Sequence, residues 1–251
     1  MNQTLGLIGS GNIGSALARF AVAAGVNVVL SNSRGPETLA ELVAELGEQA
    51  RAATPTEAAQ AGDLVVVTIP LAAYKRLPVA ALAGKTVIDT MVYYPARDGQ
   101  IAELDAGTLT SSALVQRHLS DSRVVKAFNN VDFRRLFTLA RPSGAPDRSA
   151  LPIAGDNAAA KAQVAQLVDT LGYDAVDIGT LADSWRSGPN TPVHVQPYFP
   201  ARPEGMTTDE ERWRWFLETP GVPVPAELVK ELVGMAAPVP AGGSVPAAGG
   251  E

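Results

Sequence analysis

The chain has 251 residues, of which 46% are hydrophobic and 18% charged, and its formal net charge is −6 at pH 7. This composition is typical of a globular protein with enough apolar side chains for a core. The acidic balance argues against nucleic acid or an anionic membrane surface as the main partner. The absence of cysteine excludes disulfides, thiolate catalysis and cysteine zinc sites, and it fits a cytoplasmic protein.

The chain shows no sign of a targeting or membrane segment. Its N-terminus lacks the basic lead and the unbroken apolar stretch of a secretory signal. No apolar run approaches the roughly 18 residues that a membrane-spanning helix needs. We therefore expect no membrane association.

Short apolar runs alternate with longer amphipathic runs over the first 180 residues. The predicted helices cover residues 13–24, 36–46 and 157–171. The predicted strands cover residues 4–8, 26–30, 63–69, 85–89, 123–128, 151–154 and 175–178. Because the strands are apolar throughout, helices should cover both faces of the sheet. The pattern predicts an α/β fold: a doubly wound, Rossmann-type, mostly parallel sheet.

The character of the sequence changes after Gly179. Residues 184–204 are rich in proline and irregular, and a helix is predicted to open at Thr207 or Thr208, each followed by a glutamate three residues later. A last short helix is predicted at 225–235. We expect an NADP-binding domain at 1–180, a small C-terminal extension at 181–237 that borders the substrate site, and a disordered tail at 238–251.

A glycine-rich loop follows the first predicted strand and opens the first predicted helix. It reads Gly9-Ser10-Gly11-Asn12-Ile13-Gly14, which matches G-x-G-x-x-G in the required context. In such a loop the first glycine permits the tight turn, the second lets a pyrophosphate approach the backbone, and the third lets helix and strand pack closely. The free N–H groups of the helix then hold the phosphates. The alternative is an ordinary strand–turn–helix junction without a ligand.

The end of the second predicted strand indicates which dinucleotide binds. NAD sites usually carry an acidic residue there for the ribose 2′-hydroxyl. This chain has Ser31, Asn32, Ser33 and Arg34 instead, with no acid before Glu37. Hydroxyl, amide and guanidinium groups would donate hydrogen bonds to a 2′-phosphate, so NADPH is favoured over NADH. The alternative is that Arg34 is a solvated residue of a polar turn.

Four sequence segments together resemble one family. They are GLIGSGNIGSALA, NSRGPETL, DLVVVTIP and VVKAFNN, and residues 153–181 extend the likeness. The chain resembles the F420-dependent NADP oxidoreductases and the related N-terminal domain of the STEAP metalloreductases. The resemblance implies direct hydride transfer between nicotinamide C4 and C5 of coenzyme F420, which needs positioning of two rings and exclusion of water. It implies no catalytic acid or base and no metal.

The resemblance also assigns binding roles to individual residues. Gly9, Ser10, Gly11, Asn12 and Ile13 match the phosphate loop, and Ser31, Ser33 and Arg34 match the 2′-phosphate contacts. The carboxyl ends of later strands place four further residues near the ligand: Ile69, Pro70, Phe128 and Asn129. Phe128 would approach the nicotinamide or the partner ring, with core packing as an equal alternative.

Other residues leave more than one interpretation open. Arg134, Arg135, Arg141 and Arg148 would supply positive charge for the phosphate and acidic tail of F420, or they are simply solvated. Of the two histidines, His118 is expected at the surface, and whether His194 lines the pocket stays open. Asn130 is a weaker candidate.

Three functions are compatible with these observations. The first is hydride transfer between NADP(H) and F420. The second keeps NADPH but reduces an imine, a ketone or a flavin; the glycine loop also resembles pyrroline-5-carboxylate reductases, although their long helical dimerisation domain has no match here. The third is a non-catalytic NADPH sensor. The expected partners are a small-molecule redox substrate and, in the assembly, a second copy of the chain as a homodimer.

Overall fold

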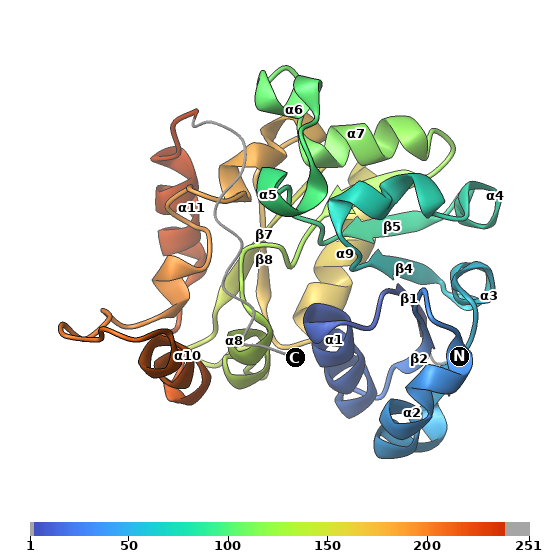
Figure 1. Ribbon diagram of the computed structural model, residues 1–251, viewed down its shortest axis with the longest axis horizontal. Helices are drawn as coiled ribbons and strands as arrows, with labels where there is room; N and C mark the ends of the chain where they lie inside the picture. The colour runs from blue at the N-terminus through green and yellow to red at the C-terminus, as the bar shows by residue number, and fades with distance from the viewer. Residues whose placement is uncertain (1–2, 239–251) are drawn as a thin grey trace.

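A computed structural model gives the fold of residues 3–238, and the predicted tail beyond residue 238 lies outside the described part (Figure 1). A single sheet has the strand order β3-β2-β1-β4-β5-β6-β7-β8. Its strands are β1 Thr4–Ile8, β2 Asn27–Ser31, β3 Ala50–Ala52, β4 Leu64–Val67, β5 Thr86–Asp89, β6 Arg123–Lys126, β7 Ala150–Gly155 and β8 Asp174–Asp177. The strands from β1 to β6 all run parallel to their neighbours.

The helices alternate with the strands along the chain. They are α1 Asn12–Ala23, α2 Ala40–Leu46, α3 Pro55–Ala61, α4 Val79–Leu82, α5 Pro95–Asp98, α6 Ala102–Asp105, α7 Ser111–His118, α8 Phe133–Thr138, α9 Ala158–Thr170, α10 Asp209–Glu218 and α11 Ala226–Gly234. Short 3-10 turns cover Pro36–Leu39, Gly47–Gln49, Leu71–Arg76, Leu181–Ser187 and Gln196–Tyr198. None of the helices within residues 3–238 is long and apolar enough to cross a membrane.

Each central strand buries both of its faces, as strand β4 shows. Leu64 and Val66 belong to the core on the side of α1 and α9, whereas Val65 and Val67 belong to a second core on the side of α7. Successive side chains of a strand point to opposite faces, so only helices on both sides can bury all four. The predicted doubly wound, mostly parallel α/β fold is therefore confirmed.

Strand β7 departs from the parallel pattern. It pairs antiparallel with β6, with Lys126 opposite Ala154, and then pairs parallel with β8. The chain therefore re-enters the sheet from the edge at which β6 ends, and it needs no crossover helix there. As a result, the start of β7 lies beside the carboxyl ends of the preceding strands, where ligands bind in open sheets of this kind.

The C-terminal extension is anchored at the start of β7. The Ala150 N–H donates to the Val224 carbonyl (2.7 Å), and the Tyr198 hydroxyl donates to the Ala150 carbonyl (2.9 Å). Helix α11 packs on β7 and β8, and α10 is held against α8 through Arg135, which donates to the carbonyls of Phe216 and Thr219. The extension is thus attached to β7, β8 and α8, while the domain boundary near residue 180 stays a prediction.

Candidate functional site: a nucleotide cleft and an adjoining chamber

The glycine loop lies at the carboxyl edge of the sheet and leaves space above it. Gly9 has a φ of 109°, which favours glycine, and its N–H donates to the Ser31 carbonyl (3.0 Å). A Cβ on Gly14 would lie 2.1 Å from the Gly9 carbonyl oxygen, so close packing requires glycine there. A Cβ on Gly11 would meet nothing within 4 Å. The loop therefore has the open face that a pyrophosphate needs.

The start of helix α1 completes this cradle. Gly11 is the N-cap and supplies no side-chain cap, and the first turn holds no acidic residue. The first N–H groups of the helix are therefore available to an anion, and the helix dipole favours negative charge there. Of the predicted loop residues, Gly11, Asn12 and Ile13 line the cleft directly, whereas the Ser10 carbonyl accepts a hydrogen bond from Ser15.

Ser31 and Asn32, both predicted to contact a 2′-phosphate, have partners within the protein, and their contact with a phosphate stays a prediction. Ser31 is fully buried, and its hydroxyl donates to the Leu7 carbonyl (2.8 Å). The Asn32 amide nitrogen donates to the Thr38 hydroxyl, and its oxygen accepts the N–H groups of Arg34 and Gly35. The Ser31 hydroxyl is thus bonded to strand β1, whereas the Asn32 side chain shapes the turn after β2, where polar side chains often satisfy nearby backbone groups.

Ser33 and Arg34 keep their side chains available. Both are exposed, and within residues 3–238 the Ser33 hydroxyl and the Arg34 guanidinium have no hydrogen-bond partner. They lie directly after β2, whose last carbonyl is bonded to the glycine loop. This geometry fits a 2′-phosphate beside the loop, held by one hydroxyl and one guanidinium.

A cleft of about 570 Å³ extends from the glycine loop across the carboxyl ends of the strands. Ile69, Pro70, Phe128 and Asn129 all line it, as predicted from their positions after β4 and β6. Phe128 is fully buried and has a φ of 58°, and Val195, on the same cleft, has a φ of 60°. Positive φ is rare for such side chains, and backbone strain of this kind gathers at functional sites.

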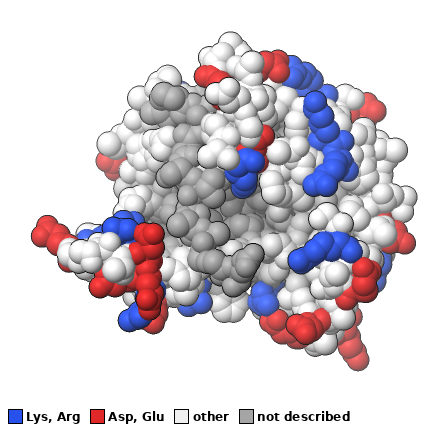
Figure 2. All heavy atoms as spheres, in the orientation of Figure 1, with Lys and Arg blue, Asp and Glu red and all other residues white. Residues whose placement is uncertain are grey.

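The far wall of the cleft is aromatic and basic, and the sequence interpretation missed it. Four rings and two guanidinium groups of the extension line it: Phe199, Trp213, Trp215, Phe216, Arg202 and Arg212. The rings of Phe199 and Trp215 are stacked with centroids 5.3 Å apart. In Figure 2 acidic side chains gather over α10 and α2, whereas the basic ones are scattered over this face. The cluster of aromatic residues at 213–216 was the sequence feature that could have predicted this wall.

Three of the four arginines considered for the F420 tail have partners within the protein. Arg135 is buried between backbone carbonyls and the ring of Phe199, with its guanidinium carbon 3.9 Å from the ring centroid. Arg148 is buried and paired with Asp169 and Asp174, and Arg141 is paired with Asp147. Arg135 thus holds the extension, Arg148 holds the region of α9 and β8, and Arg141 forms a partly exposed ion pair within its own loop.

The two histidines differ from each other in environment. His194 lines the cleft, and its Nδ1 lies 3.1 Å from the Ser187 carbonyl oxygen, to which it donates if that nitrogen carries the proton. Burial lowers the pKa of His194 to about 4, so the ring is neutral at neutral pH. His118 is half-buried rather than at the surface, with its ring edge-on to Tyr74 at 5.3 Å.

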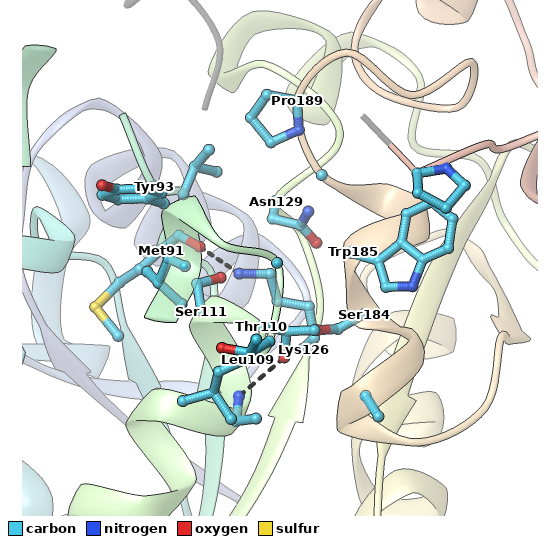
Figure 3. A pocket seen from close by; sticks show the side chains of 18 residues that line it. Met91, Tyr93, Leu109, Thr110, Ser111, Lys126, Asn129, Ser184, Trp185 and Pro189 are labelled. Carbon is cyan, nitrogen blue, oxygen red and sulfur yellow. Dashed lines mark hydrogen bonds between the residues drawn. The ribbon is translucent and has the colours of Figure 1, made fainter. Parts of the chain in front are cut away.

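A second cavity of about 440 Å³, here called the chamber, adjoins the cleft and shares Met91, Val92 and Asn129 with it. Its walls come from the segment after β5, from α7 and from the 3-10 turn Leu181–Ser187 (Figure 3). The ammonium of Lys126 stands at its base, between Met91 and Asn129. Burial lowers the pKa of Lys126, and Asp89 opposes this shift. Lys126 belongs to the VVKAFNN segment but was interpreted only as a strand residue.

Solved structures share this architecture. The hypothetical protein SMa0349 from Sinorhizobium meliloti is 29% identical with a TM-score of 0.67, and the match covers 77% of this chain and 93% of that one. A protein assigned provisionally as an F420-dependent NADP reductase, from Arthrobacter sp. FB24, gives 23% identity and a TM-score of 0.62 over 73% and 87% of the two chains. A reductive aminase from Aspergillus terreus in complex with NADPH is 19% identical with a TM-score of 0.52, and the match covers 72% of this chain and 57% of that one. The chain thus has the Rossmann-type fold of NADP-dependent oxidoreductases.

The sequence also matches one protein family over part of its length. Residues 4–93 match the family described as NADP oxidoreductase coenzyme F420-dependent. The predicted resemblance to that family is confirmed, and the link to the STEAP domain stays a prediction. The chain is also 42% identical over 64 residues to the protein YjhV of Escherichia coli (strain K12), a match that covers 26% of this chain and 43% of YjhV. The chain thus spans less than half the length of this curated relative.

Proposed function

We propose that the protein transfers a hydride between NADP(H), bound along the cleft, and a second planar redox partner, for which coenzyme F420 is the best candidate. The observation that carries the proposal is the open glycine loop beside a free Arg34, at the edge of the sheet where the cleft runs. The family match over residues 4–93 supports F420 as the partner. A cytoplasmic location and a homodimer stay predictions from the sequence.

The side chains and backbone of the cleft would perform binding and orientation. The N–H groups at the start of α1 would hold the pyrophosphate, and Ser33 and Arg34 the 2′-phosphate. When bound, NADPH supplies a hydride from its nicotinamide ring. Phe128 would form the wall behind that ring, and Asn129, which lines both the cleft and the chamber, would lie beside it.

The far wall of the cleft suits a second aromatic ring with an anionic tail. Trp215 and Phe199 offer a stacking surface. The Arg202 guanidinium lies 5.6 Å from the Trp215 ring centroid and is exposed, and it has no ion pair within residues 3–238. It would take over the role first predicted for the arginines after β6, that is, binding the phosphate of F420.

Reduction of a small imine or ketone is the second candidate function. The chamber favours it, because its described lining includes one cation, Lys126, and no arginine. Such a cavity suits a compact uncharged molecule better than a phosphate-bearing one.

The test is a spectrophotometric screen of NADPH oxidation with F420, FMN, a cyclic imine and a ketone as acceptors. We expect turnover with F420 to exceed that with the other acceptors, and NADPH to bind at least about tenfold more tightly than NADH. Turnover confined to the imine or ketone would establish the second candidate instead. Tight NADPH binding without turnover of any acceptor would establish the non-catalytic sensor.

A further inference from the structure

We propose that the chamber receives the carbonyl or imine group of the hydride acceptor, and that Lys126 donates the proton which this group takes up. The inference rests on the proposed hydride transfer. It assigns a proton donor to a reaction for which the sequence predicted no catalytic side chain.

The hydrogen bonds of Lys126 leave one donor free. Lys126 is the last residue of β6 and is 3% exposed. Its Nζ donates to the Met91 carbonyl and lies 3.4 Å from Asp89 Oδ2. An ammonium has three N–H groups, and the third finds no acceptor within residues 3–238. Because Nζ lines the chamber, a ligand there can take this third hydrogen bond (Figure 3).

The pairing with Asp89 does not by itself explain a buried lysine. The Asp89 carboxylate already accepts the Ser112 hydroxyl (2.7 Å) and the Met91 N–H (2.8 Å), and Lys126 is its most distant partner. Burying an ammonium costs several kcal/mol, which a single long ion pair repays poorly. A buried lysine that lines a cavity is typical of a functional group.

The electrostatic surroundings suit a general acid. Asp89 on β5 is the acidic group that faces the ammonium, and its charge favours the protonated form. His194, across the chamber's shared wall, is neutral, and the positive charge of Lys126 contributes to lowering its pKa. Tyr93, also on the chamber, donates its hydroxyl to Asp105. The net effect of burial is a lowered pKa for Lys126, and a proton donor works best when its pKa approaches the working pH.

The rest of the chamber defines the ligand as an uncharged group. Leu109, Trp185 and Pro189 form apolar walls. Asn129 donates its Nδ2 to the Ser187 carbonyl (2.8 Å), which orients the amide and leaves Oδ1 as an unpaired buried acceptor. A donor and an acceptor in an apolar cavity fit a carbonyl or imine before reduction, and the O–H or N–H formed after it. The ring of F420 and a small ketone or imine both carry such groups.

The acceptor carbon takes the hydride that NADPH supplies, and the π electron pair moves to the oxygen or nitrogen, which takes a proton from Lys126 Nζ. The acceptor gains two electrons and becomes an alcohol, an amine or a ring N–H, while the dinucleotide is oxidised to NADP⁺. Lys126 is left as a neutral amine and regains a proton from water.

The first test compares Lys126→Met and Lys126→Arg with the wild type and with the surface control Lys230→Met. With whichever acceptor the wild type reduces, Lys126→Met should lower kcat by about 100-fold or more, and the NADPH Kd should stay within about twofold. The wild-type kcat should fall as pH rises through the Lys126 pKa, and Lys126→Arg should abolish that dependence, since arginine does not titrate there. The double variant Asp89→Asn/Lys126→Met removes the unpaired buried carboxylate, should the single variant fail to fold. A folded variant that keeps kcat and the pH profile would overturn the proposal.

The second test needs no turnover and separates this proposal from the proposed function. Benzaldehyde with cyanoborohydride should alkylate Lys126 in the wild type, as mapped by mass spectrometry, and Ser111→Phe should block this reaction because Ser111 lines the chamber. Lys230 should react equally in both proteins. If no acceptor is reduced, but Lys126 is alkylated in the wild type and not in Ser111→Phe, the proposed hydride transfer is refuted. The chamber is then still a site that binds carbonyl compounds. If Lys230 reacts and Lys126 does not, the chamber proposal fails.

Discussion

At the scale of single residues, two glycines of one loop should respond oppositely to substitution. Gly11→Val adds a side chain to open space, so the fold should lose at most about 1 kcal/mol through the N-cap position, while NADPH binding is abolished. Gly14→Ala places a Cβ 2.1 Å from the Gly9 carbonyl oxygen and should destabilise the protein by about 1–3 kcal/mol. Urea denaturation and NADPH titration of both variants measure the contrast. Unchanged NADPH affinity in a folded Gly11→Val protein would remove the loop from the site.

The cofactor preference should depend on Arg34. A charge-assisted hydrogen bond to the 2′-phosphate is worth about 1.5–3 kcal/mol, so Arg34→Ala should weaken NADPH roughly ten- to hundredfold and leave NADH nearly unchanged. Arg51→Ala, which removes another exposed arginine, is the control. Dissociation constants for both nucleotides decide the outcome. A loss shared equally by NADH and NADPH would refute the assignment of NADPH.

The neutral, partly buried His194 should make the fold sensitive to acid. Its folded-state pKa of about 4 lies below the usual value of about 6.5, so the unfolded chain binds the extra proton between these values. The contribution of His194 to stability is therefore present above about pH 6.5 and is lost as pH falls toward 4, by roughly 2 kcal/mol between pH 7 and pH 5. His194→Gln should reduce this loss, measured as the difference in unfolding free energy between pH 7 and pH 5. An identical pH dependence in the variant would contradict the prediction.

At the scale of elements, the start of α10 allows a matched test of helix capping. The sequence offered two registers, and the structure uses Thr208, whose hydroxyl accepts the Glu211 N–H, while the Glu211 side chain accepts the Thr208 N–H. Thr208→Ala should destabilise the protein by about 1 kcal/mol, and Thr207→Ala by clearly less. Thermal unfolding of the two variants provides the comparison. Equal losses would mean that neither threonine is the dominant cap.

At the scale of the whole molecule, the extension and the sheet should unfold together. All three tryptophans, Trp185, Trp213 and Trp215, belong to the extension, whereas far-UV circular dichroism reports mainly on the sheet and its helices. Because Ala150 and Arg135 bond the extension to the rest, the two probes should give the same midpoint. NADPH at about 100 times its Kd should raise the unfolding free energy by about 2.7 kcal/mol for both probes. Two separate transitions would identify an independent C-terminal unit.

Local features of the chain were sufficient for much of the fold and for the position of the cleft. The alternation of apolar strands with amphipathic helices, and the glycine loop between β1 and α1, depend on residues close together in the sequence. The carboxyl-edge rule then placed Ile69, Pro70, Phe128 and Asn129 on one cleft, where they are found.

Contacts between distant segments decided the rest. The Ser31 hydroxyl donates to the Leu7 carbonyl, Arg135 donates to a carbonyl of α10, and β7 pairs antiparallel with β6. Local sequence patterns predict none of these contacts. The same holds for Lys126, which resembles any strand residue until Met91 and Asn129 enclose its ammonium. Whether a polar group is free for a ligand depends on which partners folding brings to it, because a buried donor or acceptor must be satisfied before it can serve elsewhere.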